Sequence, residues 1–81
     1  FHVSGWWDGD MPGAYQNFAG MRASAKTEAA RKGQVLVMGP WTHFFNTQRK
    51  LGEVDYGDEA VIDLESCHLR FFDRHLKGIE N

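Results

Sequence analysis

The sequence predicts an α/β fold with parallel strands, in the order strand, helix, strand, loop and helix. Residues 1–7 form a short aromatic run, residues 14–32 carry apolar or small side chains at intervals of three and four, and residues 34–38 form an apolar run. A strand, a helix and a second strand at this spacing make one βαβ unit. A chain of 81 residues has room for one small domain.

The first strand is expected over residues 1–7, and it ends at Asp8. Residues 9–13 contain three Gly and Pro residues, which predicts a loop. One long helix is expected over residues 14–32. Arg31 and Lys32 suit the negative end of its dipole, and Gly33 suits the position just beyond a helix.

The second strand is expected over residues 34–38, between Gly33 and Gly39. An uninterrupted apolar run of this length is typical of a strand buried on both faces of a parallel sheet. Residues 44–56 are polar and irregular, so we expect a surface loop there. Residues 64–77 predict a second helix, with Asp63 as its N-cap and Gly78 at its end. Its apolar stripe consists of Leu64, Leu69, Phe71, Phe72 and Leu76.

The composition excludes several classes of function. The net charge is −2 and no basic run exceeds two residues, which argues against nucleic-acid binding. No apolar run approaches about 18 residues, so no membrane span is expected. The single Cys67 cannot form an internal disulfide, and His68 and His75 lack a third ligand for a metal, so we expect no metal and no cofactor. The sequence leaves the compartment open, with a cytoplasmic location favoured over a secreted one.

Asp8 is the first candidate catalytic residue. It follows the first predicted strand, and catalytic groups of open α/β sheets gather outside the carboxyl ends of the strands. A carboxylate there can accept the Nδ1 proton of a histidine and so orient its ring. The simpler alternative is a loop Asp that caps the next helix or closes a turn. Asp10 lies close by, but in a Gly-rich segment where a turn role suits it better.

His43 is the second candidate, because it follows the second predicted strand. Pro40 and Trp41 precede it and would hold its side chain in place. A neutral imidazole can take a proton from a nucleophile and return it to a leaving group. The alternative is a loop His that bonds only to backbone. Three tryptophans near these residues either line a substrate pocket or belong to the core: Trp6, Trp7 and Trp41.

Three ordered motifs resemble those of the cocaine-esterase-like acyl hydrolases, a family close to the X-prolyl dipeptidyl peptidases and cephalosporin acylases. Residues 5–8 (GWWD) resemble the motif with the triad acid, residues 39–43 (GPWTH) the motif with the triad base, and residues 71–78 (FFDRHLKG) a helix that closes the hydrolase domain. Residues 15–18 (YQNF) are similar to the helix that follows the acid. Phe44, Phe45 and Asn46 depart from the smaller polar residues often found after the His, which leaves substrate preference open.

The resemblance implies that residues 1–81 are the C-terminal segment of an α/β-hydrolase catalytic domain, with Asp8 and His43 as triad acid and base. It also implies that the nucleophilic Ser, the oxyanion donors, a cap domain and a jelly-roll domain lie outside this sequence. The partners would then be an ester or amide substrate and the remainder of the hydrolase domain, with a homo-oligomer left open. The chain alone should be inactive. Within the family, an X-prolyl dipeptidyl peptidase or a cephalosporin acylase is the alternative to an esterase. Two further alternatives are a small non-catalytic α/β interaction module and an inactive hydrolase-like protein.

Overall fold

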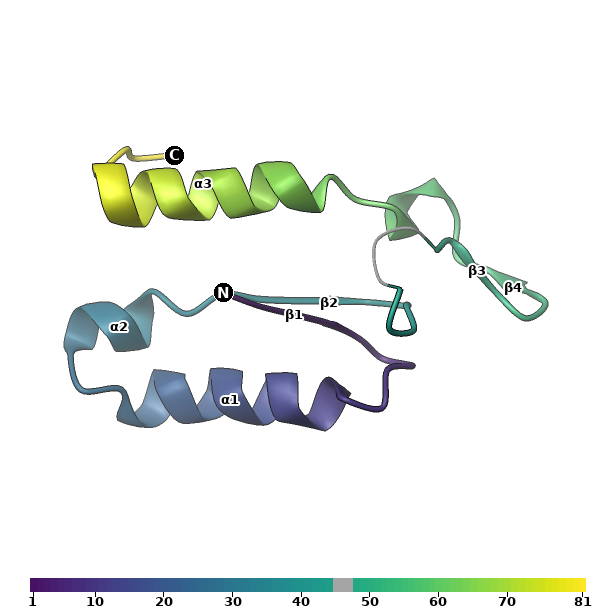
Figure 1. The fold of residues 1–81 in the computed structure, drawn as a ribbon, viewed down its shortest axis with the longest axis horizontal. Helices are drawn as coiled ribbons and strands as arrows, with labels where there is room; N and C mark the ends of the chain where they lie inside the picture. The colour runs from purple at the N-terminus through teal and green to yellow at the C-terminus, as the bar shows by residue number, and fades with distance from the viewer. Residues whose placement is uncertain (45–47) are drawn as a thin grey trace.

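The computed structural model describes residues 1–44 and 48–81, and its centre is a pair of parallel strands. Strand β1 (His2–Gly5) pairs with β2 (Leu36–Gly39) in a register that runs from His2 opposite Leu36 to Gly5 opposite Gly39. The predicted parallel pairing of these segments is therefore confirmed. Both strands end at the same edge of the sheet, on the right of Figure 1.

Two helices, rather than one, connect the strands. Helix α1 (Met11–Ser24) starts earlier than expected, so the predicted loop over residues 9–13 is wrong in its second half. The predicted single helix over residues 14–32 is also wrong, because Thr27 caps a separate helix, α2 (Glu28–Lys32). The Thr27 hydroxyl accepts a hydrogen bond from the Ala30 N–H at 3.1 Å, which satisfies a free donor in the first turn of α2.

A short hairpin replaces part of the loop expected over residues 44–56. Strands β3 (Lys50–Leu51) and β4 (Val54–Asp55) pair antiparallel, with Gly52 at a positive φ of 59° in the turn between them. The prediction of an irregular loop is therefore wrong for this stretch. Residues 45–47, which include Phe45 and Asn46 of the family comparison, lie outside the described residues.

The last helix has the predicted bounds. A 3₁₀ turn, η1 (Asp58–Ala60), precedes α3 (Leu64–Lys77). The Asp63 carboxylate accepts from the Ser66 N–H at 3.0 Å, and Gly78 ends the helix at a φ of 72°. Asp63 as N-cap and Gly78 as the terminating residue are therefore both confirmed.

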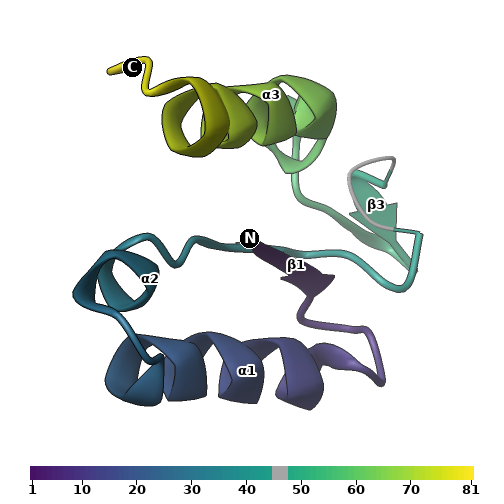
Figure 2. The ribbon, with the colours of Figure 1, turned by 60° about the vertical axis from the view of Figure 1, so that its left-hand side comes forward.

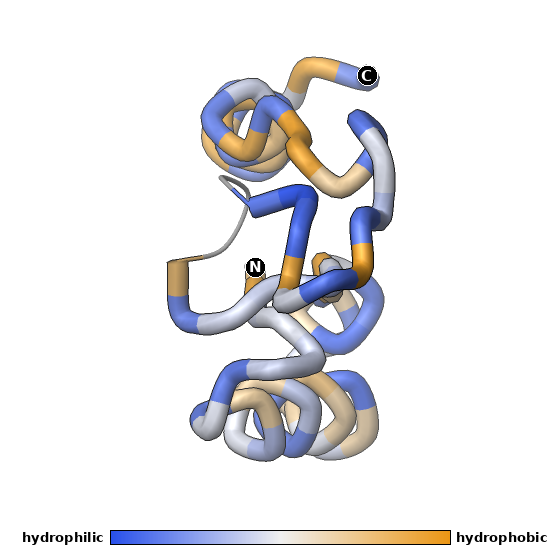
Figure 3. The backbone as a smooth tube through the Cα atoms, turned by 90° about the vertical axis from the view of Figure 1, so that its right-hand side faces the viewer, coloured by the Kyte–Doolittle hydropathy of each residue, from blue (hydrophilic) through white to orange (hydrophobic). Residues whose placement is uncertain are grey.

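The helices cover opposite faces of the small sheet. Helix α1 lies on one side of β1 and β2 and α3 on the other, in both ribbon views (Figures 1 and 2). Figure 3 shows apolar residues along α3, and three of its large ones remain exposed: Leu69, Phe72 and Leu76. The apolar residues of β2 are only half-buried, short of the burial on both faces that the sequence predicted.

Among the described residues, the best-buried side chain is that of Trp41, at 2% exposure. Its indole N–H donates to the carbonyl of Ala60, which ties the end of β2 to the turn before α3. Ala60 and Leu64 are buried beside this connection. Among the described residues, no helix has the length and apolar character needed to cross a bilayer.

Candidate active site

Backbone hydrogen bonds fix the segment that carries Asp8. The N–H of Trp6 donates to Gly39 O at 2.9 Å, and the N–H of Trp7 donates to Trp41 O at 3.0 Å, so the pairing of the strands continues beyond their ends. The chain then turns, with the Asp8 N–H donating to Gly5 O at 3.1 Å. Asp8 is thereby held next to the segment that leads from β2 to His43.

Glycine is required at the ends of both strands because Trp41 lies against them. A Cβ atom on Gly5 would lie 2.1 Å from Trp41 O, and one on Gly39 would lie 2.2 Å from Trp41 Cε2. Both distances are far below van der Waals contact. The two glycines and the buried tryptophan therefore form one packed unit, and this unit sets the separation of Asp8 and His43.

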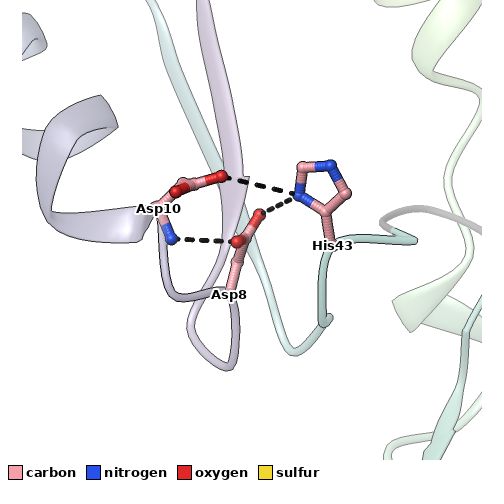
Figure 4. Close-up of side chains that lie close together, drawn as sticks. All are labelled: Asp8, Asp10 and His43. Atoms are coloured by element: carbon pink, nitrogen blue, oxygen red, sulfur yellow. Dashed lines mark hydrogen bonds and ion pairs between the residues drawn. The ribbon is translucent and has the colours of Figure 1, made fainter.

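Asp8 and His43 meet at the carboxyl edge of the sheet. His43 Nδ1 lies 3.1 Å from Asp8 Oδ2, and the other carboxylate oxygen, Oδ1, accepts the Asp10 N–H at 2.9 Å (Figure 4). The Asp8 side chain is 7% exposed, whereas that of His43 is 71% exposed. The Asp8 carboxylate is thus buried with a hydrogen bond on each of its oxygens, and the imidazole of His43 is exposed.

The hydrogen bonds of Asp8 keep it ionised. The backbone N–H of Asp10 is the largest cause that lowers the pKa of Asp8, and the hydrogen bond and charge of His43 add to it, while burial opposes them. An ionised carboxylate only accepts hydrogen bonds, so Nδ1 of His43 must be the donor. In the neutral ring, this leaves Nε2 with a free lone pair. Nε2 has no hydrogen-bond partner within residues 1–44 and 48–81, and Figure 4 shows it directed away from both carboxylates.

Asp10 lies at the edge of this arrangement. Its Oδ2 is 3.8 Å from His43 Nδ1, its side chain is 84% exposed, and it makes no side-chain cap for α1. Asp8 closes a turn through its Oδ1, as the simpler alternative expected, and in addition contacts His43. Ligand atoms of Asp8, Asp10 and His43 lie within 4.8 Å of one another, so these three residues could hold a divalent cation. A cation on Nδ1 would have to displace the proton that Asp8 accepts.

The tryptophans separate into two environments. Trp41 lies in the core, whereas Trp6 and Trp7 are each 58% exposed. Trp6 lines a cavity of about 420 Å³ with Met11, Pro12, Tyr15 and Gln16, next to the segment that carries Asp8.

The remaining histidines lie away from Asp8 and His43: His2 bonds to Gln34 at 2.8 Å, and His68 and His75 are on α3.

Two residues near His43 were not anticipated from the sequence. The Oε1 atom of Gln48 accepts from both the N–H and the hydroxyl of Thr42, at 3.1 and 2.6 Å, and so anchors the residue before His43. The carbonyl oxygen of Ala60 accepts a hydrogen bond from the indole N–H of Trp41 and so anchors that side chain. No local pattern marks either residue: Ala60 acts over 19 residues, and Gln48 acts over 6 residues.

Comparison with known proteins gives one line of evidence. The chain is 31% identical over 79 residues to the cocaine esterase of Rhodococcus sp. (strain MB1 Bresler). The match covers 94% of this chain and 12% of that esterase, so the chain spans a small part of its relative's length. No protein-family profile matches the chain, and no solved structure matches it significantly. The relationship between the chain and that esterase is distant and partial.

Proposed function

We propose that this chain is part of a serine acyl hydrolase of α/β-hydrolase fold, and that it supplies the triad acid, Asp8, and the triad base, His43. The 3.1 Å contact between Asp8 Oδ2 and His43 Nδ1 carries the proposal. The parallel strands and the similarity to an esterase support it. The nucleophilic Ser would belong to another part of the same polypeptide, because no serine of this chain lies in a G-x-S-x-G elbow.

In this mechanism Asp8 orients His43 and His43 transfers the proton. Nε2 of His43 takes the proton of the Ser hydroxyl while the Ser oxygen attacks the carbonyl carbon of an ester or activated amide. The same proton passes to the leaving alcohol or amine as its bond to the acyl carbon breaks. His43 then takes a proton from water, whose oxygen attacks the acyl carbon. The proton passes from His43 to the Ser oxygen as the bond between that oxygen and the acyl carbon breaks, which releases the acid and restores the free Ser. Asp8 stabilises the imidazolium formed in each half.

The proposed substrate is defined by the class of bond that is cleaved. An ester is the favoured substrate because the similar protein is an esterase. X-prolyl dipeptides and cephalosporin side chains are the alternatives within the resembled family. The cavity beside Trp6 is apolar and aromatic, which suits a hydrophobic group of the substrate.

A second candidate function is a non-catalytic interaction module. The exposed apolar side chains of Leu69, Phe72 and Leu76 on α3 favour it, because a contiguous apolar face on a small domain marks an interaction surface. In this case Asp8 and His43 would only hold the two strand ends together. The absence of any fluorophosphonate label on the folded full polypeptide would favour this function over a hydrolase segment.

The test is fluorophosphonate labelling of the full polypeptide that carries this segment. We expect a single label on a Ser outside residues 1–81. Asp8→Asn should slow ester turnover by about 10⁴-fold, because the ring then adopts the wrong tautomer. Asp73→Asn on α3 is the matched control and should leave turnover unchanged. Turnover that survives His43→Ala, or a label on Ser4, Ser24 or Ser66, would exclude the proposed triad.

A further inference from the structure

A cavity larger than the one beside Trp6 lies at the end of the sheet opposite to Asp8 and His43. It has a volume of about 590 Å³, within the range of sites for small organic ligands. Phe1, which precedes β1, and Val35, which precedes β2, line it, whereas Asp8 and His43 follow these strands. Its other wall is α3, so the cavity is independent of the proposed triad.

The lining combines an apolar floor with a basic rim. Val37 and Phe71 belong to the apolar part, and the basic residues that line it are Lys32, Arg70, Arg74 and His75. No acidic side chain lines the cavity among the described residues. The chain as a whole carries a net charge of −2, so this concentration of basic groups is local.

The two arginines are free to bind a ligand. The carboxylates of Glu28 and Asp73 form ion pairs with lysines: Glu28 with Lys32 at 2.6 Å, and Asp73 with Lys77 at 3.1 Å. Neither carboxylate is therefore paired with an arginine of the cavity. Neither Arg70 nor Arg74 makes an ion pair within the described part of the chain. A guanidinium presents two parallel N–H donors that match a carboxylate.

The two walls of the cavity meet through a few side chains. A Cβ atom on Gly33 would lie 2.9 Å from His75 Cε1, so glycine permits α3 to approach the turn between α2 and β2. The rings of Phe71 and His75 lie 4.4 Å apart, and those of Phe1 and Phe71 lie 5.5 Å apart. These ring contacts fix the apolar floor beneath the basic rim.

We propose that this cavity binds an organic carboxylate with an apolar body, with the carboxylate on Arg70 and Arg74 and the apolar part against Val37 and Phe71. Charge complementarity selects the anionic head, and the apolar floor selects the body. A small hydrophilic anion would leave the floor exposed, and a neutral apolar molecule would leave the arginines unpaired.

Cys67 lines the cavity and is the only cysteine of the chain, so it reports occupancy directly. The experiment measures the rate at which N-ethylmaleimide alkylates Cys67 in the 81-residue chain, with decanoate added below its micelle concentration. We expect decanoate to slow alkylation in a saturable manner, and 1-decanol and inorganic phosphate at the same concentration to have little effect.

The variants test the role of the arginines. Arg70→Gln combined with Arg74→Gln should raise the decanoate concentration for half-protection by about tenfold or more, because charged hydrogen bonds are lost. Arg22→Gln on α1 is the matched control and should leave it unchanged. The proposal would be overturned if 1-decanol or phosphate protected Cys67 as well as decanoate does. It would also be overturned if the double variant needed the same decanoate concentration for half-protection as the unaltered chain. The comparison of ligands on the unaltered chain stands even if the double variant does not fold.

Discussion

Gly5→Ala should disrupt the packing that brings Asp8 to His43. The added methyl group would lie 2.1 Å from Trp41 O and 2.5 Å from Trp41 C. A comfortable contact is about 3.5 Å, so the backbone at Trp41 must move by more than about 1 Å. Trp41 O cannot retreat freely, because it accepts the N–H of Trp7 at 3.0 Å, and the Trp41 ring is enclosed.

The expected cost follows from these constraints. Overpacking usually costs about 1–3 kcal/mol, and a clash with backbone belongs at the upper end of that range. A chain of this size has a free energy of unfolding of about 4–12 kcal/mol, so the loss is a large fraction of the total. The melting temperature should fall by about 10 °C or more.

The assay is thermal and urea unfolding followed by circular dichroism. Gly20→Ala is the matched control, because Gly20 lies inside α1 and a Cβ atom there meets nothing within 4 Å. That substitution should raise the free energy of unfolding by about 0.5–1 kcal/mol. If Gly5→Ala melts within a few degrees of the unaltered chain while Gly20→Ala is stabilised, the packing argument is refuted.

Three further substitutions test other parts of the structure. Trp41→Phe should lower the free energy of unfolding in urea by about 1–3 kcal/mol, because the buried Ala60 carbonyl loses its donor; an unchanged midpoint would contradict that hydrogen bond. Thr27→Ala should cost about 1 kcal/mol by the loss of the cap on α2, whereas Thr27→Ser should cost little in the same assay. Since the pKa of Asp8 is lowered in the folded state, its stabilising effect is complete at neutral pH and disappears as the pH falls below about 4. The difference in stability from Asp8→Asn should shrink over that interval, and a constant difference would count against this contribution.

The sequence predicted the elements whose signals are local. The Asp63 cap and the terminal Gly78 bound α3 as expected. The division of the first helix was missed because apolar spacing and small residues continue across it. The Thr27 cap that causes it was visible as a Thr followed by an acidic residue. The hairpin at Gly52 was missed because each of its strands has only two residues.

In the candidate site, too, residues with a local sequence signal could be predicted and residues that act through tertiary contacts could not. Asp8 and His43 could be selected from their positions after two predicted parallel strands, and the structure places them in contact. The support of Trp41 by Ala60 and of Thr42 by Gln48 depends on contacts over 19 and 6 residues, with no local signature. The half-buried state of β2 likewise depends on the number of neighbouring elements, which residues 34–38 do not encode.

The tautomer of His43 is the most direct test of the proposed role of the Asp8–His43 pair. Long-range ¹H–¹⁵N correlation spectra of the imidazole, recorded at roughly pH 9 where a free ring is neutral, distinguish protonation at Nδ1 from protonation at Nε2. We predict a proton on Nδ1 and an unprotonated Nε2 in the unaltered chain, and loss of this preference in Asp8→Asn. A ring protonated at Nε2 in the unaltered chain would contradict the account, because that nitrogen could not then accept a proton from a nucleophile.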